Sequence, residues 1–101
     1  MMKKIILQQA ALELNDAVSY YEEQQRGLGL RLKSEINEMV NWIMKNPEMP
    51  RIREGGYRRV NLKVFPYYIA YIVRNEVLWI LAIAHSHQEP EYWIIRQDKI
   101  N

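Results

Sequence analysis

Residues 65–93 constrain the fold of this chain most, because they include most of its aromatic residues, both histidines and its longest apolar run. Apolar side chains occupy almost every position of 67–73 and of 77–83, and polar residues 74–76 separate the two runs. Aromatic and β-branched residues favour strands, and a short polar break suits a tight connection, so the pattern predicts a β-hairpin. A strand that is apolar at nearly every position must be covered on both faces. We therefore expect the chain's own helices on one face, and its C-terminal tail or a partner on the other.

Two further segments are expected to add strands to this hairpin. Residues 3–7 are short, apolar and β-branched, with lysines that suit an edge strand, and residues 57–62 alternate so that Arg59 points away from the helices. Strict alternation within the last strand would place Leu81 and Ile83 on the same face.

Two helices are expected between the first strand and the rest of the sheet. A helical period begins at Gln8, glycines within 27–29 break it, and a second period runs to the stop at Pro47. So short a link predicts an antiparallel helix hairpin whose apolar stripes face the sheet, with Glu13 and Asp16 on the polar side of the first helix. The two stripes are Ala10, Leu14, Ala17, Val18 and Tyr21, and Leu32, Ile36, Met39, Val40 and Ile43. With about two helical turns after Pro90, the order is that of an α+β fold, β-α-α-β-β-β(-α).

Length and composition narrow the class of protein. At 101 residues, 49% apolar and 26% charged, the chain predicts one globular domain over 1–101. It has no cysteine, which excludes disulfides and thiolate chemistry and fits a reducing cytoplasm. The apolar run near the start ends at Leu7, so we expect neither export nor a membrane span.

Positive charge is concentrated in the segment 49–74, which has six basic residues against Glu54 alone. Such a segment is suited to attract phosphate or an acidic polypeptide, although a solvated loop explains it equally well. The nucleic-acid-binding candidates are Arg51, Arg53, Arg58 and Lys63.

The order of elements and several short motifs resemble the RelE/ParE toxin family over nearly the whole chain. The motifs are the helix hairpin with Gly27-Leu28-Gly29, Asn46-Pro47, Tyr57-Arg58-Arg59-Val60, Phe65-Pro66-Tyr67, Tyr71, Ala82-Ile83-Ala84-His85, Pro90, Tyr92-Trp93 and Arg96. The resemblance implies a cytoplasmic toxin of a bacterial type II toxin–antitoxin pair, held inactive by a cognate antitoxin. Some members of the family cleave messenger RNA on the ribosome, and others poison DNA gyrase without chemistry of their own.

Four residues are candidates for a metal-independent cleavage of RNA. His85 and His87 are suited to acid–base catalysis, Arg59 to holding the scissile phosphate, and Tyr92 to approaching from the tail. Structural roles compete with each of these: a backbone hydrogen bond for His85, pairing with carboxylates or with the antitoxin for Arg59, and packing of the tail for Tyr92. Two histidines without further ligands at suitable spacing do not predict a metal site, and no cofactor is expected.

Two departures from the family pattern weaken the nuclease hypothesis. The nucleases resembled here have an arginine on the third strand where this chain has Tyr68, and an arginine-rich segment where it has Ser86-His87-Gln88-Glu89. Three hypotheses therefore stay open: a toxin that acts on ribosome and messenger RNA, a toxin that binds gyrase, and a non-toxic module that only binds an antitoxin. For the antitoxin, a helix across the helix hairpin and an added strand at a sheet edge are both expected modes.

Overall fold

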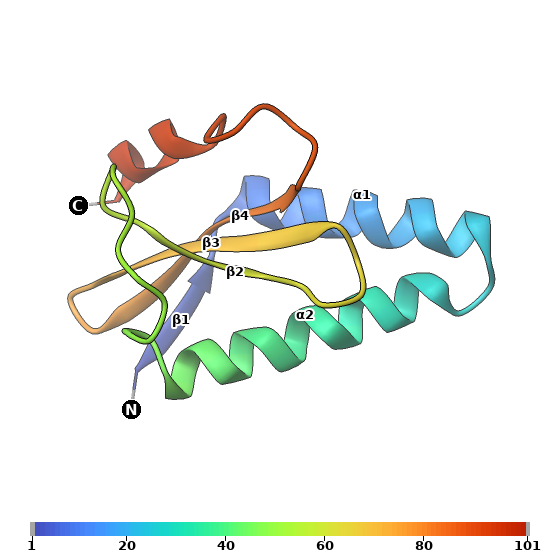
Figure 1. Cartoon of the computed structure of the whole chain (residues 1–101), viewed down its shortest axis with the longest axis horizontal. Helices are drawn as coiled ribbons and strands as arrows, with labels where there is room; N and C mark the ends of the chain where they lie inside the picture. The colour runs from blue at the N-terminus through green and yellow to red at the C-terminus, as the bar shows by residue number, and fades with distance from the viewer. Residues whose placement is uncertain (1, 101) are drawn as a thin grey trace.

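The computed structural model describes residues 2–100 and shows a twisted sheet between a long helix hairpin and a short C-terminal helix (Figure 1). The elements in chain order are β1 (Lys3–Ile6), α1 (Gln8–Gln24), α2 (Leu28–Lys45), β2 (Arg58–Asn61), β3 (Tyr67–Arg74), β4 (Val77–His85) and the 3₁₀ helix η1 (Ile94–Lys99). Among residues 2–100, no helix combines the length and the hydropathy that crossing a membrane requires.

The four strands lie in the order β1-β4-β3-β2. Strand β1 runs parallel to β4, whereas the β2–β3 and β3–β4 pairs are antiparallel. The prediction of an α+β fold, with a helix hairpin on a mainly antiparallel sheet, is confirmed.

The helix hairpin covers one face of the sheet, which we call the helix face. Both predicted stripes lie in this core: Ala10, Ala17, Leu32, Ile36 and Ile43 are at most 4% exposed, and the other stripe residues pack around them. The strands contribute their own apolar residues, of which Ile69, Tyr71, Leu78, Ile80 and Ile83 are the most buried. The 3.6-residue period therefore identified the helix side of the core correctly.

Glycines at the helix–helix link allow the close packing of the hairpin. Gly27 has a φ of 88°, a left-handed conformation that glycine adopts without strain. A Cβ at Gly29 would stand 2.3 Å from the Val18 carbonyl oxygen, so a larger residue there would push α1 and α2 apart. The Glu22 carboxylate accepts the backbone N–H groups of Gly27 (2.8 Å) and Gly29 (2.9 Å), which satisfies donors at the start of α2.

The C-terminal tail covers the other face of the sheet, which we call the tail face. Trp93 is fully buried there, edge-on to Tyr57 at 4.6 Å, and its indole N–H donates to the Tyr68 hydroxyl at 2.9 Å. The end of the C-terminal tail is held to β3 as well, because the Arg74 guanidinium donates to the Ile100 carbonyl oxygen at 2.9 Å. The second cover that the apolar strands require is thus supplied by the tail.

A register shift in the β3–β4 pair changes which residues of β4 share a face. Ala70 pairs with Ala82 but Tyr71 pairs with Ile80, so the ladder contains a bulge at Leu81. Leu81 consequently packs with the tail-face cluster, whereas Ile83 packs with the helix-face core. The expectation that Leu81 and Ile83 lie on one face is wrong, because strict alternation fails at a bulge.

Candidate functional site

Polar side chains converge on the outer edge of β4, where no strand covers it. The pairing of β4 with β1 ends at Ile80, so the backbone groups beyond it need other partners. Glu13 of α1 accepts the backbone N–H of Ile83 at 3.1 Å, and Arg96 of η1 donates to the carbonyl oxygen of Leu81 at 2.9 Å. A helix side chain and a tail side chain therefore replace the missing strand.

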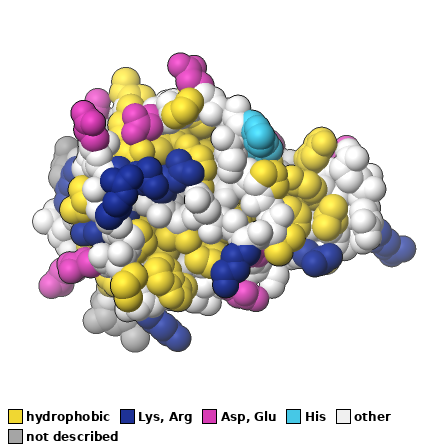
Figure 2. All heavy atoms as spheres, in the orientation of Figure 1, with side chains coloured by type: hydrophobic (Ala, Val, Ile, Leu, Met, Phe, Trp, Pro, Cys, Tyr) yellow, Lys and Arg dark blue, Asp and Glu magenta, His cyan; other side chains and the backbone are white. Residues whose placement is uncertain are grey.

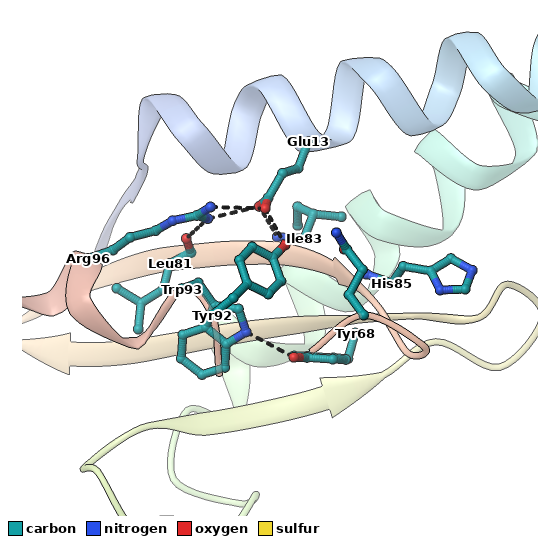
Figure 3. Close-up of polar contacts among 9 residues, drawn as sticks. Glu13, Tyr68, Leu81, Ile83, His85, Tyr92, Trp93 and Arg96 are labelled. Atoms are coloured by element: carbon teal, nitrogen blue, oxygen red, sulfur yellow. Dashed lines mark hydrogen bonds and ion pairs between the residues drawn. The ribbon is translucent and has the colours of Figure 1, made fainter. Parts of the chain in front are cut away.

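The same two side chains form a two-pronged ion pair that holds the tail. Arg96 Nη1 and Nη2 lie 2.9 Å and 3.0 Å from Glu13 Oε1 and Oε2, and both side chains are mostly buried. Tyr92 donates its hydroxyl to the same carboxylate, and Figure 3 shows the three groups meeting beneath α1. Burial, and then the hydrogen bond to Glu13, raises the pKa of Tyr92 far above its ordinary value. At neutral pH the Tyr92 hydroxyl is thus a fixed structural donor to Glu13.

His85 lies at the end of β4 on the helix face. It pairs with Tyr67 in the ladder, and the two rings stand edge-to-face with centroids 5.0 Å apart. The backbone N–H of His87 donates to His85 Nδ1 at 3.0 Å, so the neutral His85 ring has its proton on Nε2. The two histidine rings are 5.3 Å apart, which brings together the two residues predicted for acid–base catalysis.

Arg59 lies on the tail face, away from His85. Its pairing partner Ala70 belongs to the tail-face cluster, and its guanidinium stacks 3.8 Å from the centre of the Tyr68 ring. Its Nη2 donates to Asn61 at 2.9 Å, whereas its Nε is buried without a hydrogen-bond partner among residues 2–100.

Arg59 and His85, which the sequence predicted to act together on one phosphate, therefore do not share a surface, and that prediction is wrong. Strand β3 lies between β2 and β4, and the ladder partners of Arg59 and His85 belong to opposite faces of the sheet. The physical reason is the register, since residues that pair directly across a ladder project to the same face.

The basic segment is partly engaged in holding its own loop. Arg58 donates to the carbonyl oxygens of Pro50 (2.5 Å) and Glu48 (3.2 Å), so this candidate for phosphate binding fixes the connection between α2 and β2. The other candidates in the segment are Arg51, Arg53 and Lys63. Figure 2 shows one patch of Lys and Arg side chains on the face that it presents, with further separate ones over the rest of that face, and the cyan histidine lies outside the patch.

Glu13 and Arg96 are the key residues that the sequence did not assign to a site. Glu13 was expected on the polar side of α1, yet it reaches β4. The sequence did contain a signal for this contact. Ala10 and Ala17 stand three residues before and four residues after Glu13, on the same side of the helix. Such small neighbours let the carboxylate approach the sheet.

Comparison with known proteins gives a family match and matches to solved structures. The sequence model of a family described as the ParE toxin of type II toxin-antitoxin system, parDE, matches residues 5–90. The solved structure described as "Chromosomal ParDE TA system from P. aeruginosa" has a TM-score of 0.74 and 24% sequence identity, over 84% of this chain and 96% of that chain. None of the curated proteins compared with the sequence matches it.

Proposed function

The chain belongs to the ParE toxin family of type II toxin–antitoxin systems, and from that premise we propose that it stops growth by binding DNA gyrase, without catalysing a reaction. As a type II toxin it has an antitoxin partner. The separation of Arg59 and His85 by the sheet is the observation that carries the choice of binding over catalysis.

Metal-independent cleavage of RNA needs a base, an acid and a cation around one phosphate. Here the histidine pair is on the helix face, and the Arg59 guanidinium is stacked on Tyr68 on the tail face. The fourth candidate, Tyr92, donates its hydroxyl to Glu13 and has a raised pKa. This arrangement supports a binding toxin better than a nuclease.

A supercoiling assay with purified gyrase tests the proposal directly. The protein is expected to inhibit supercoiling and to cause cleaved DNA to accumulate, and the protein encoded by the adjacent reading frame is expected to relieve both effects. That addition is also the control for non-specific inhibition by a basic protein. Normal supercoiling over a full titration would overturn the proposal.

The two competing hypotheses have their own outcomes in cells. Codon-positioned cuts in messenger RNA, with gyrase unaffected, would point to a ribosome-dependent nuclease. Normal growth under overexpression, with binding of the adjacent gene product retained, would point to an inert antitoxin-binding module. Gyrase, ribosome and antitoxin would all meet the toxin in the cytoplasm, which is where we propose it acts.

A further inference from the structure

A pocket of about 360 Å³ opens between α1 and the ends of β3 and β4, beside the histidines. Its α1 wall consists of Glu13, Asp16, Ala17 and Tyr20, which recur at helical spacing on one side of the helix. Its other lining residues are Tyr67, Ile83, His85 and Gln88. We call it the Asp16 pocket.

The lining of this pocket is suited to a cation. Three aromatic rings and two carboxylates line it, whereas no lysine or arginine of residues 2–100 does. The Glu13 carboxylate already accepts hydrogen bonds from Arg96, Tyr92 and the β4 backbone. Asp16 is exposed and has neither a hydrogen bond nor an ion pair within the described part of the chain. One free negative charge therefore stands next to exposed tyrosine.

The chain places two of its own guanidinium groups next to tyrosine rings, and one of these also binds a carboxylate. On the other side of Glu13, Arg96 is bound by a carboxylate, with its guanidinium 5.3 Å from the centre of the Tyr92 ring. On the tail face Arg59 lies 3.8 Å over the Tyr68 ring. The Asp16 pocket repeats the carboxylate and tyrosine of the Arg96 site, but neither lysine nor arginine of residues 2–100 lines it.

We propose that the Asp16 pocket receives an arginine side chain of the antitoxin. Arginine fits better than lysine, because its planar guanidinium stacks on aromatic rings and binds a carboxylate through two hydrogen bonds. Tyr20 is 56% exposed at the rim, and an exposed aromatic residue beside a charged group is typical of a protein-binding site. The inference rests on the proposed neutralisation of this chain by a protein antitoxin.

A small probe tests the pocket without any partner. Titration of the ¹⁵N-labelled protein with N-acetyl-L-arginine amide is expected to shift the backbone signals of Asp16, Tyr20 and His85, and Asp16→Asn is expected to abolish those shifts. The neutral analogue N-acetyl-L-citrulline amide, which has nearly the same shape, is the matched ligand control. Shifts of equal size with the citrulline compound, or none with the arginine compound, would overturn the proposal.

The partner itself provides the second test, with the protein encoded by the adjacent reading frame as the probe. Asp16→Asn is expected to weaken its binding about tenfold, which is the usual effect of losing one charged hydrogen bond. Glu23→Gln removes the same charge from the exposed side of α1 outside the pocket, and is expected to leave the affinity unchanged.

Failure of the pocket proposal can be distinguished from failure of the proposed toxin–antitoxin pairing. If the adjacent gene product binds the wild type and Asp16→Asn equally well, the pocket proposal is wrong and the toxin–antitoxin pairing stands. If that protein does not bind the wild type, the pairing fails, and the titration with the arginine compound still decides whether the pocket accepts a guanidinium.

Discussion

The two faces of the sheet are closed by different means. The helix face is covered by α1 and α2, whose apolar stripes form a broad, mainly aliphatic core. The tail face is covered by a six-residue 3₁₀ helix and its flanks, with the aromatic group of Tyr57, Tyr68 and Trp93 at the centre. No residue of the 3₁₀ helix itself is buried, so the Glu13–Arg96 ion pair and other polar contacts add to the burial of Trp93 in holding the tail in place. The helix face is stabilised mainly by its buried apolar area, whereas the tail face also depends on a few specific polar contacts.

Loss of volume on the helix face is expected to have the largest effect. Leu32 is fully buried between the helices and the sheet, so Leu32→Ala should lower the free energy of unfolding by about 2–5 kcal/mol. The loss should be cooperative, with hydrogen exchange accelerated throughout the sheet and both helices. Leu30→Ala on the exposed side of α2 is the matched control, since Leu30 is 64% exposed. Comparable losses in the two variants would contradict the assigned core.

On the tail face, removing one charge should release the tail before the rest of the molecule. Glu13→Gln leaves the Arg96 guanidinium partly buried without its counter-ion, and we expect a loss of about 1–3 kcal/mol. Amides of residues 92–100 should lose protection more than those of α2, as measured by hydrogen exchange.

A double-mutant cycle with Arg96→Met separates this coupling from other effects. Once Arg96 is absent, Glu13→Gln should cost clearly less than it does in the wild type. Additive losses would show that the ion pair does not fasten the tail.

One buried tyrosine on each face makes stability depend on pH at alkaline values. Burial, and then the hydrogen bond with Glu91, raises the pKa of Tyr57 to about 12, and burial raises the pKa of Tyr71 to about 12. Both hydroxyls donate, Tyr57 to Glu91 at 2.6 Å and Tyr71 to the Pro47 carbonyl oxygen at 2.8 Å. The folded pKa lies above the unfolded value of 10.0, so this stabilisation is complete below pH 10 and is lost as the pH rises towards 12.

Urea unfolding between pH 8 and about 11.5 measures this loss. Tyr57→Phe and Tyr71→Phe should each flatten the decline, whereas Tyr20→Phe, at an exposed position, should follow the wild type. A decline as steep in both variants as in the wild type would contradict the assigned hydrogen bonds.

The smallest expected effect is at the turn of the β3–β4 hairpin, which belongs to neither face. Asn75 and Glu76 have φ values of 56° and 61°, and a non-glycine residue there is strained. Glu76→Gly should raise the free energy of unfolding by about 0.5–1 kcal/mol without changing the exchange pattern of either face. Thermal unfolding measures whether the variant is more stable than the wild type. A less stable variant would show that Glu76 makes a contact that outweighs the strain.

The helix face was predictable from the sequence, whereas for the tail face only the need for a cover, by the tail or by a partner, was predictable. Periodicity identified the stripes of α1 and α2, and the glycines within 27–29 and Pro47 identified their ends. The bulge at Leu81 was not predictable, because it depends on the pairing of two strands and leaves no mark in local composition. The sequence also separates Glu13 from Arg96 by most of the chain, so their contact depended on the strand order, which placed the uncovered half of β4 between α1 and η1.

Our central proposal is that this toxin acts by binding, because Arg59, predicted to hold the phosphate, and His85, predicted for acid–base catalysis, lie on opposite faces of the sheet. The most direct test is growth arrest by the double variant Arg59→Ala/His85→Ala, with transcript ends mapped in the same cells and folding checked by circular dichroism. The double variant is expected to arrest growth as the wild type does, with transcripts uncut in both cultures. Codon-positioned cuts with the wild type that disappear in the folded double variant, together with the growth arrest, would contradict the claim.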